Sequence, residues 1–306
     1  MKIILNLVFS VALLTSCLAQ KERLELHLSK GEIYPQKMIS NMSIIQTING
    51  QQINTSLTLD GKMTFKVIDI DNSIYNMEVR YESISMKINL PNGVKEFSSE
   101  KNDEKDIFSS ILNQLKNKPF LIKMTKTGKI REVKNIDSLF LRVFDKFPQL
   151  SDVQKEQIRN QLMQSYGEKA FKGNLEMVSA IFPDSSVSKG NKWIINTKLE
   201  SGMAGKMEST YEYKDKTDSY IQIIGDSKIS TDNKDAYIES NGMPLKFDLN
   251  GIMNSDIKIN KYSGWILDAR ITQSIKGTAY VKDNPKMPGG MTMPMIINNE
   301  MTITEK

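Results

Sequence analysis

The sequence predicts an α+β fold in which two long-stranded, antiparallel, curved β-halves carry a central helical segment packed on them. Apolar and polar residues alternate with the period of two that half-buried strands show, both before residue 97 and after residue 190. Between residues 100 and 183 the period changes to that of amphipathic helices. Helices grouped between two β-blocks favour an α+β architecture, because parallel βαβ units would alternate helices with strands.

The N-terminal segment has the features of a secretory leader. A basic start at Lys2 precedes an apolar run over residues 3–14. That run is too short to span a bilayer, which requires roughly 20 mostly apolar residues. We therefore expect residues 1–16 to be removed as a signal peptide, and residues 17–23 to serve as an anchor and linker.

Two cleavage sites overlap at the end of this leader. Residues 14–17 read LTSC, which resembles the lipobox of bacterial lipoproteins, whereas residues 17–19 read CLA and would end a signal peptide at residue 19. We favour lipidation of Cys17, because two or more acyl chains anchor a protein firmly and the only cysteine would otherwise stay a free thiol in an oxidising compartment. The expected location is the cell envelope, lipid-anchored at the outer membrane. The alternative is a soluble periplasmic or secreted protein.

The charge balance gives no indication of a nucleic-acid partner. The chain has 41 Lys and Arg against 36 Asp and Glu, a formal net charge of +5, and the basic residues are spread evenly. Nucleic-acid binding would require clustered Lys and Arg. A single cysteine also excludes an internal disulfide, so the fold must be held by its core.

Residues 24–97 are expected to form the first β-half. Leu24, Leu26 and Leu28 alternate with polar residues, and the same alternation runs through residues 53–60. Asn-Gly and similar dipeptides tolerate the positive φ of tight hairpins, which predicts an antiparallel meander of strands of about ten residues. The expected turns are Asn49-Gly50, Asp60-Gly61, Asp71-Asn72 and Asn92-Gly93.

Residues 100–183 are expected to be helical apart from one hairpin. Apolar stripes at helical spacing, prolines that end them and an Ser-x-x-Gln capping box define the helices. The expected elements, in order, are a helix over residues 107–115, a hairpin over 120–133 that turns at Thr127-Gly128, a helix over 139–144, a helix that begins at Ser151 and ends at Gly167, and a helical piece up to Ile181.

The strand period returns over residues 190–304, the second β-half. The alternating or apolar runs lie at residues 193–199, 207–213, 221–224, 245–249, 257–259 and 265–271. Together with the preceding segments they predict a single α+β domain over residues 24–306. Trp193 and Trp265 are expected to anchor its core or a strand turn, since large aromatic side chains dominate core packing.

Three segments and the leader resemble a known family. Residues 122–130 read IKMTKTGKI, residues 182–193 read FPDSSVSKGNKW, and residues 262–265 read YSGW. They resemble a family of uncharacterised exported lipoproteins of Bacteroidota-type bacteria, for which no activity can be carried over. The layout of long antiparallel strands with helices across one face is similar, more loosely, to the lipoprotein-carrier half-barrels of bacterial envelopes.

No catalytic residue, cofactor or zinc site is expected. His27 is the only histidine and lies on the polar side of its alternating segment, which is typical of a solvent-facing strand residue. One histidine and one cysteine cannot supply the usual zinc ligands. The acidic residues near Asp69 and Asp106 fit a hairpin turn and a helix start.

Methionine is abundant, with 18 residues, and clusters near the C-terminus. Met287, Met291, Met293 and Met295 carry a remote hypothesis of copper(I) binding, because soft thioethers bind that ion. We favour the alternative that these side chains fill an adaptable apolar surface.

These exclusions predict a protein that is not an enzyme. The favoured function is a non-catalytic module that binds an apolar ligand (a lipid, an acyl chain or a hydrophobic peptide) on its curved sheet. The alternative is an envelope scaffold that contacts another protein through a sheet edge or face. The expected partners are thus the membrane, through the N-terminal lipid, and an apolar molecule or an envelope protein.

Overall fold

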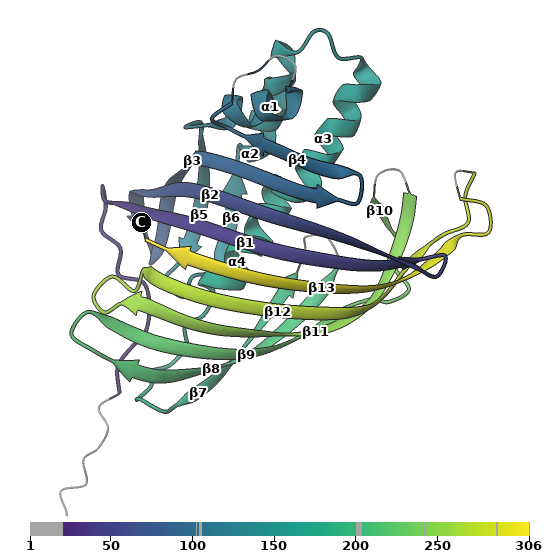
Figure 1. Ribbon diagram of the computed structural model, residues 1–306. Coiled ribbons are helices and arrows are strands. Elements are labelled where there is room, and N and C mark those ends of the chain that lie inside the picture. The colour runs from purple at the N-terminus through teal and green to yellow at the C-terminus, as the bar shows by residue number, and fades with distance from the viewer. Residues whose placement is uncertain are drawn as a thin grey trace, which may run out of the picture.

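The computed structural model describes residues 21–101, 103, 106–199, 204–240, 243–285 and 287–305. Its body is one strongly curved antiparallel sheet of 13 strands (Figure 1). The strands are β1 (Ile33–Ile48), β2 (Gln51–Asp71), β3 (Ile74–Leu90), β4 (Gly93–Ser98), β5 (Pro119–Thr125), β6 (Ile130–Lys134), β7 (Lys192–Leu199), β8 (Gly205–Lys216), β9 (Tyr220–Thr231), β10 (Ile238–Ser240), β11 (Met243–Asn260), β12 (Ile266–Val281) and β13 (Met291–Thr304). The helices are α1 (Ile107–Leu115), α2 (Ile136–Val143), the 3₁₀ turn η1 (Phe144–Lys146), α3 (Asp152–Tyr166) and α4 (Glu168–Ser179).

The two predicted β-halves are one continuous sheet. The order across it is β6-β5-β3-β2-β1-β13-β12-β11-β9-β8-β7, with β4 paired to β3 and β10 to β11. The join is the pairing of β1 with β13, from Lys37 opposite Thr304 to Gln46 opposite Met295. Each predicted half is a contiguous run of strands, and the two runs form one sheet because the first and last strands, β1 and β13, pair with each other. The helical segment is also a smaller part of the fold than expected.

One predicted turn is absent, and the strands are longer than expected. Asp60 and Gly61 lie inside β2, where Gly61 pairs with Met38 on one side and with Ile84 on the other. The Asp60 carboxylate lies 3.5 Å from the Nζ of Lys37 on the neighbouring strand. Cross-strand pairing on both edges thus keeps this dipeptide extended.

The other hairpin turns and the helices confirm the prediction. Asn49, Asn72 and Gly93 have φ values of 51°, 46° and 137°, as tight turns require. The hydroxyl of Ser151 accepts from the backbone N–H of Gln154, whose side chain accepts from the N–H of Ser151, so the predicted capping box starts α3.

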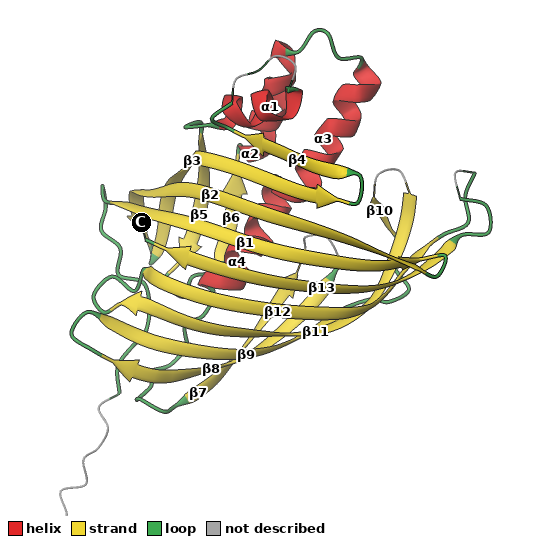
Figure 2. Ribbon diagram, viewed as in Figure 1, coloured by secondary structure: helices red, strands yellow, loops and turns green. Residues whose placement is uncertain are grey.

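Helix α4 connects the two ends of the sheet, β6 and β7. The N–H of Ile130 in β6 donates to Glu176 Oε1 over 2.7 Å, and the indole N–H of Trp193 in β7 donates to the carbonyl of Ile181 over 2.9 Å. Figure 2 shows α4 as the red helix behind the sheet. The hydroxyl of Ser179 also donates to the carbonyl of Gly128, in the turn between β5 and β6. The face of the sheet toward α4 is called the inner face below.

The segment before β1 closes one end of this curved sheet, called the closed end below. Leu24, Leu26 and Leu28 are only 2–5% exposed, yet they pair with no strand of the sheet. The N–H of Leu26 donates to the carbonyl of Lys126, and that of Leu28 donates to the hydroxyl of Tyr75. The alternation predicted for residues 24–28 is real, but the segment crosses the strand ends as a cap.

Charged contacts hold this cap in place and begin at Glu22, within the segment predicted to be a linker. The Glu22 carboxylate accepts from Lys216 Nζ and the Tyr213 hydroxyl, and Glu25 accepts from Lys126 Nζ over 3.1 Å. Partial burial alone would raise the pKa of both glutamates, but these hydrogen bonds outweigh it and lower each pKa below its ordinary value.

Candidate functional site

The far end of the sheet, around the turn between β1 and β2, carries an apolar inner face with incomplete cover. Strand alternation and register place its side chains on the same face as the buried Met301 and Ile303. We call this set the far inner face: Met42, Ile44, Gln46 and Ile48 of β1, Ile53, Thr55 and Leu57 of β2, Ile88 and Leu90 of β3, and Met291, Met293, Met295 and Ile297 of β13. None of these residues is charged, and each except Met293 is only partly buried.

The closed end shows what full cover of the same face looks like. Phe65, Met77 and Val79 lie on β2 and β3 with 0% of their surface exposed, beneath the core built with the helices. The pattern of alternating apolar residues is the same at both ends of these strands. The far inner face therefore has the composition of a core surface but lacks the layer that covers a core.

A small second core overlaps the far inner face along β13, where Met293 belongs to both. Its buried members are Leu245, Ala279, Val281 and Met293. The side chains of Met287, Met291 and Met295 pack against it, partly buried. The four methionines of the copper(I) hypothesis thus contribute to one apolar cluster, as the favoured interpretation predicted. Their metal affinity stays a prediction.

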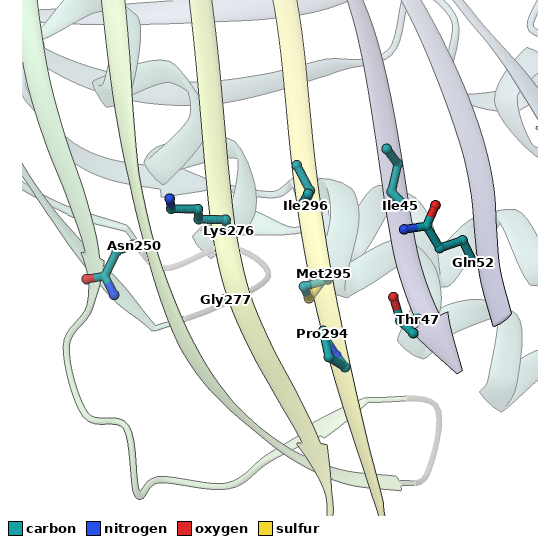
Figure 3. A pocket seen from close by; sticks show the side chains of 9 residues that line it. All are labelled: Ile45, Thr47, Gln52, Asn250, Lys276, Gly277, Pro294, Met295 and Ile296. Atoms are coloured by element: carbon teal, nitrogen blue, oxygen red, sulfur yellow. The ribbon is translucent and has the colours of Figure 1, made fainter. Parts of the chain in front are cut away.

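A separate hollow of about 410 Å³ lies on the opposite, outer face of the sheet (Figure 3). It crosses β2, β1, β13, β12 and β11. Its lining consists of Ile45, Thr47, Gln52, Asn250, Lys276, Gly277, Pro294, Met295 and Ile296. The register places Ile45 opposite Ile296 and Lys276 opposite both Asn250 and Ile296, so apolar and polar side chains share this surface. Met295 contributes from the far side, since its side chain belongs to the inner face.

Of the remaining residues considered from the sequence, His27 lies in the cap at the closed end. His27 has 51% of its side chain exposed, and its Nδ1 lies 4.0 Å from Glu25. Within the described ranges, no three His, Cys, Asp or Glu side chains gather as a metal site would require. Cys17 and the leader lie outside the described residues.

The two tryptophans are structural anchors, as predicted. Trp265 is 4% exposed, packs against Tyr34 and Phe65 with ring centroids 5.3 Å away in both cases, and donates its indole N–H to the carbonyl of Pro35. Trp193 is held by its bond to Ile181. Neither lines the far inner face or the outer hollow.

The sequence predicted neither the residues of the far inner face nor those of the outer hollow. The alternation that signals both is continuous along each strand, and only the three-dimensional packing separates the covered end from the uncovered one. Among the helices that the structure describes, none combines the length and apolar character needed to cross a bilayer.

Comparison with solved structures gives only distant likenesses. A lipovitellin structure concerned with lipid–protein interactions has a TM-score of 0.49 at 10% identity and covers 91% of this chain. This chain spans 25% of the length of that lipovitellin chain. An outer membrane channel from Pseudomonas putida F1 has a TM-score of 0.26 at 8% identity, with 92% of this chain and 97% of the channel covered. Both TM-scores lie below 0.5, so neither likeness indicates a function for this chain.

A search of curated proteins found no match. In contrast, the sequence model of a family of unknown function, DUF6263, matches residues 72–266. The match runs from the turn before β3 to the first residue of β12 and includes all four α-helices. Because it covers more than half of the sequence, this chain belongs to the DUF6263 family, a family of unknown function.

Proposed function

We propose that the protein is a non-catalytic module that binds a lipid, an acyl chain or a hydrophobic peptide along the far inner face. The observation that carries the proposal is an uncharged apolar strand surface left partly exposed on the inner side of a curved sheet. Removal of such a surface from water is favourable by roughly 25 cal/mol for each Å² of apolar area. A ligand that covers about 40 Å² at one of these side chains therefore gains about 1 kcal/mol there.

The character of the lining favours a flexible apolar ligand. Ile44, Leu57 and Ile88 present branched aliphatic surface, while Met291 and Met295 add unbranched side chains that adapt to different shapes. Gln46 and Thr55 are the polar members of this surface, and no charge is available there for an ionic group. A charged headgroup would therefore stay outside the far inner face, while apolar chains lie along it.

The proposal includes export and lipid attachment at Cys17. The leader supports export, and the packed body begins at Glu22, at the closed end. The intervening residues can span at most about 18 Å, since an extended chain covers about 3.6 Å per residue. A lipid on Cys17 would hold the closed end near the bilayer and leave the far inner face pointing away from it. The intact mass of the mature N-terminus tests this part, because acyl chains on residue 17 and a free start at residue 20 differ in mass.

Native mass spectrometry of protein purified from its own host tests the binding itself. We expect a bound apolar molecule that is released by organic extraction. The variant Ile44→Glu places a carboxylate on the far inner face and should abolish the bound mass. Its matched control is Ile252→Glu, which makes the same change at an exposed position on the outer face of β11, outside the outer hollow, and should retain the mass.

A clean apo mass in the wild-type protein would contradict the proposal. If cross-linked membranes then gave a stoichiometric protein partner and no extracted ligand, the scaffold alternative would hold instead. Circular dichroism of both variants establishes that each retains the sheet, so that lost binding is not lost folding. The milder Ile44→Thr variant, which keeps a β-branched side chain, serves if Ile44→Glu does not fold.

A further inference from the structure

We propose that the outer hollow is a second ligand site, which takes a small amphipathic anion with one acidic group and an apolar tail, such as a monocarboxylate. The site lies on the opposite face of the sheet from the far inner face. Its occupancy is therefore independent of the proposed function.

Two glycines lie in β11 and β12, the adjacent strands at one side of the hollow. Gly277 of β12 has a φ of 152°, and a Cβ added there would lie 2.0 Å from the carbonyl oxygen of Asp248 on β11. A Cβ on Gly251 of β11 would lie 2.5 Å from the carbonyl oxygen of Ser274 on β12. Glycine inside a strand is typical of a tight bend and a close backbone approach. A side chain at either glycine would therefore collide with the backbone of the neighbouring strand on the inner face. The hollow lies on the outer face of the same two strands.

The middle of the hollow is apolar. Ile45 and Ile296 are cross-strand neighbours on the outer face, and Ile296 is 43% exposed. Pro294 follows on the same face of β13 and offers no N–H to solvent. This apolar floor spans two strands and can contact the tail of a ligand.

Polar side chains surround this floor, and their pairing differs from that of other polar residues on the outer face. Elsewhere on the outer face polar side chains pair across strands, as Thr58 does with Asn41 over 2.9 Å and Ser274 with Asn298 over 2.8 Å. Within the described part of the chain, the side chains that line the hollow make no such hydrogen bond or ion pair. They are Thr47, Gln52, Asn250 and Lys276. Their hydrogen-bonding groups are free to bind a ligand.

The charge at the hollow selects an anion. Among the described residues that line the hollow, Lys276 is the one that carries a charge, and none is a carboxylate. Some other lysines of this sheet face acids on the neighbouring strand, as Lys37 does with Asp60 over 3.5 Å and Lys123 with Glu132 over 2.9 Å. A single uncompensated ammonium fits a single carboxylate, and the amide N–H of Asn250, directly opposite Lys276, can donate to the same group. A volume of about 410 Å³ with an apolar floor and a few polar groups is typical of small-molecule sites.

Isoleucine-methyl NMR of the purified protein separates the two faces, because Ile45 and Ile296 face the hollow while Ile44 and Ile297 lie on the inner face. Titration with octanoate should shift the methyl signals of Ile45 and Ile296, whether or not the tail also contacts Ile44 and Ile297 on the far inner face. Affinity for the outer hollow is read from the Ile45 and Ile296 signals alone. Octanol shares the tail and lacks the charge, so its affinity should be at least tenfold lower. Acetate shares the charge and lacks the tail, so it should give no saturable shift.

The variant Lys276→Gln should weaken octanoate binding about tenfold, or about 1.4 kcal/mol. Lys228→Gln removes an exposed lysine on the outer face of β9 and should leave the affinity unchanged. Shifts confined to Ile44 and Ile297, equal affinity for octanol, or equal effects of the two lysine variants would each overturn the proposal. Failure of the inner-face ligand to appear in native mass spectrometry would leave this titration unaffected.

Discussion

The contact between helix α4 and the β5–β6 turn gives the sharpest test of how the sheet ends are joined. At Gly128, with a φ of 78°, an added Cβ would lie 1.8 Å from the carbonyl oxygen of Ser179. The variant Gly128→Ala must therefore accept a left-handed backbone, at about 1–2 kcal/mol, and displace a backbone carbonyl, at about 1–3 kcal/mol. We expect a loss of about 2–5 kcal/mol in the free energy of unfolding.

Gly50 provides the matched control for this variant. It has a φ of 80° in another turn, and a Cβ added there meets nothing within 4 Å. Gly50→Ala should therefore lose only the backbone cost of about 1–2 kcal/mol. Urea unfolding, followed by the fluorescence of Trp193 beside α4, measures both values. If the two variants agree within about 0.5 kcal/mol, the close approach of the turn to α4 does not contribute to stability and the reasoning fails.

Three further predictions concern acid, packing and metal. Because the pKa values of Glu22 and Glu25 are lowered in the folded state, their contribution to stability is present above about pH 4.3 and is lost as the pH falls through the lowered values. The protection of residues 24–28 from hydrogen exchange, measured relative to the intrinsic exchange rate at each pH, should therefore fall in acid. A Glu22→Gln/Glu25→Gln double variant that keeps the same acid dependence would refute this. Met77→Ala should cost about 2–5 kcal/mol in urea unfolding because Met77 is fully buried, whereas Leu57→Ala on the partly exposed far inner face should cost less than about 1.5 kcal/mol; equal losses would show that the far inner face is packed like the core. A competition titration with a copper(I) chelator should show no uptake at micromolar metal, since the methionines from Met287 to Met295 pack in an apolar cluster, and stoichiometric uptake would revive the copper hypothesis.

Local chemistry made the helices and most turns predictable. Ser151 and Gln154 cap α3 because their spacing along the chain alone brings them together. Asn49-Gly50 forms the turn between β1 and β2 for an equally local reason, since both residues tolerate positive φ. The same rule failed at Asp60-Gly61, where pairing with β1 and β3 outweighs the turn preference of the dipeptide.

The candidate sites depend on packing that no local pattern records. Ile44 and Phe65 both belong to alternating strands, but only Phe65 lies beneath the core. Lys276 faces no acid directly across the sheet because the register of β12 places it opposite Asn250 on one side and Ile296 on the other. Prediction of either site from sequence would require the cross-strand partners of each residue, which long-range pairing alone determines.

The insertion of β13 between β1 and β12 has a consequence for how this protein reaches its native state. Until residues 291–304 are in place, β1 and β12 each present a long row of unpaired backbone N–H and C=O groups. Contacts between such distant parts of a chain form slowly, and open strand edges can pair with other chains in the meantime. The pairing of β1 with β13 is therefore the long-range step that closes the sheet, whereas β12 and β13 pair as sequence neighbours. The interval before β1 and β13 pair is the period in which a helper that shields strand edges would be of most use.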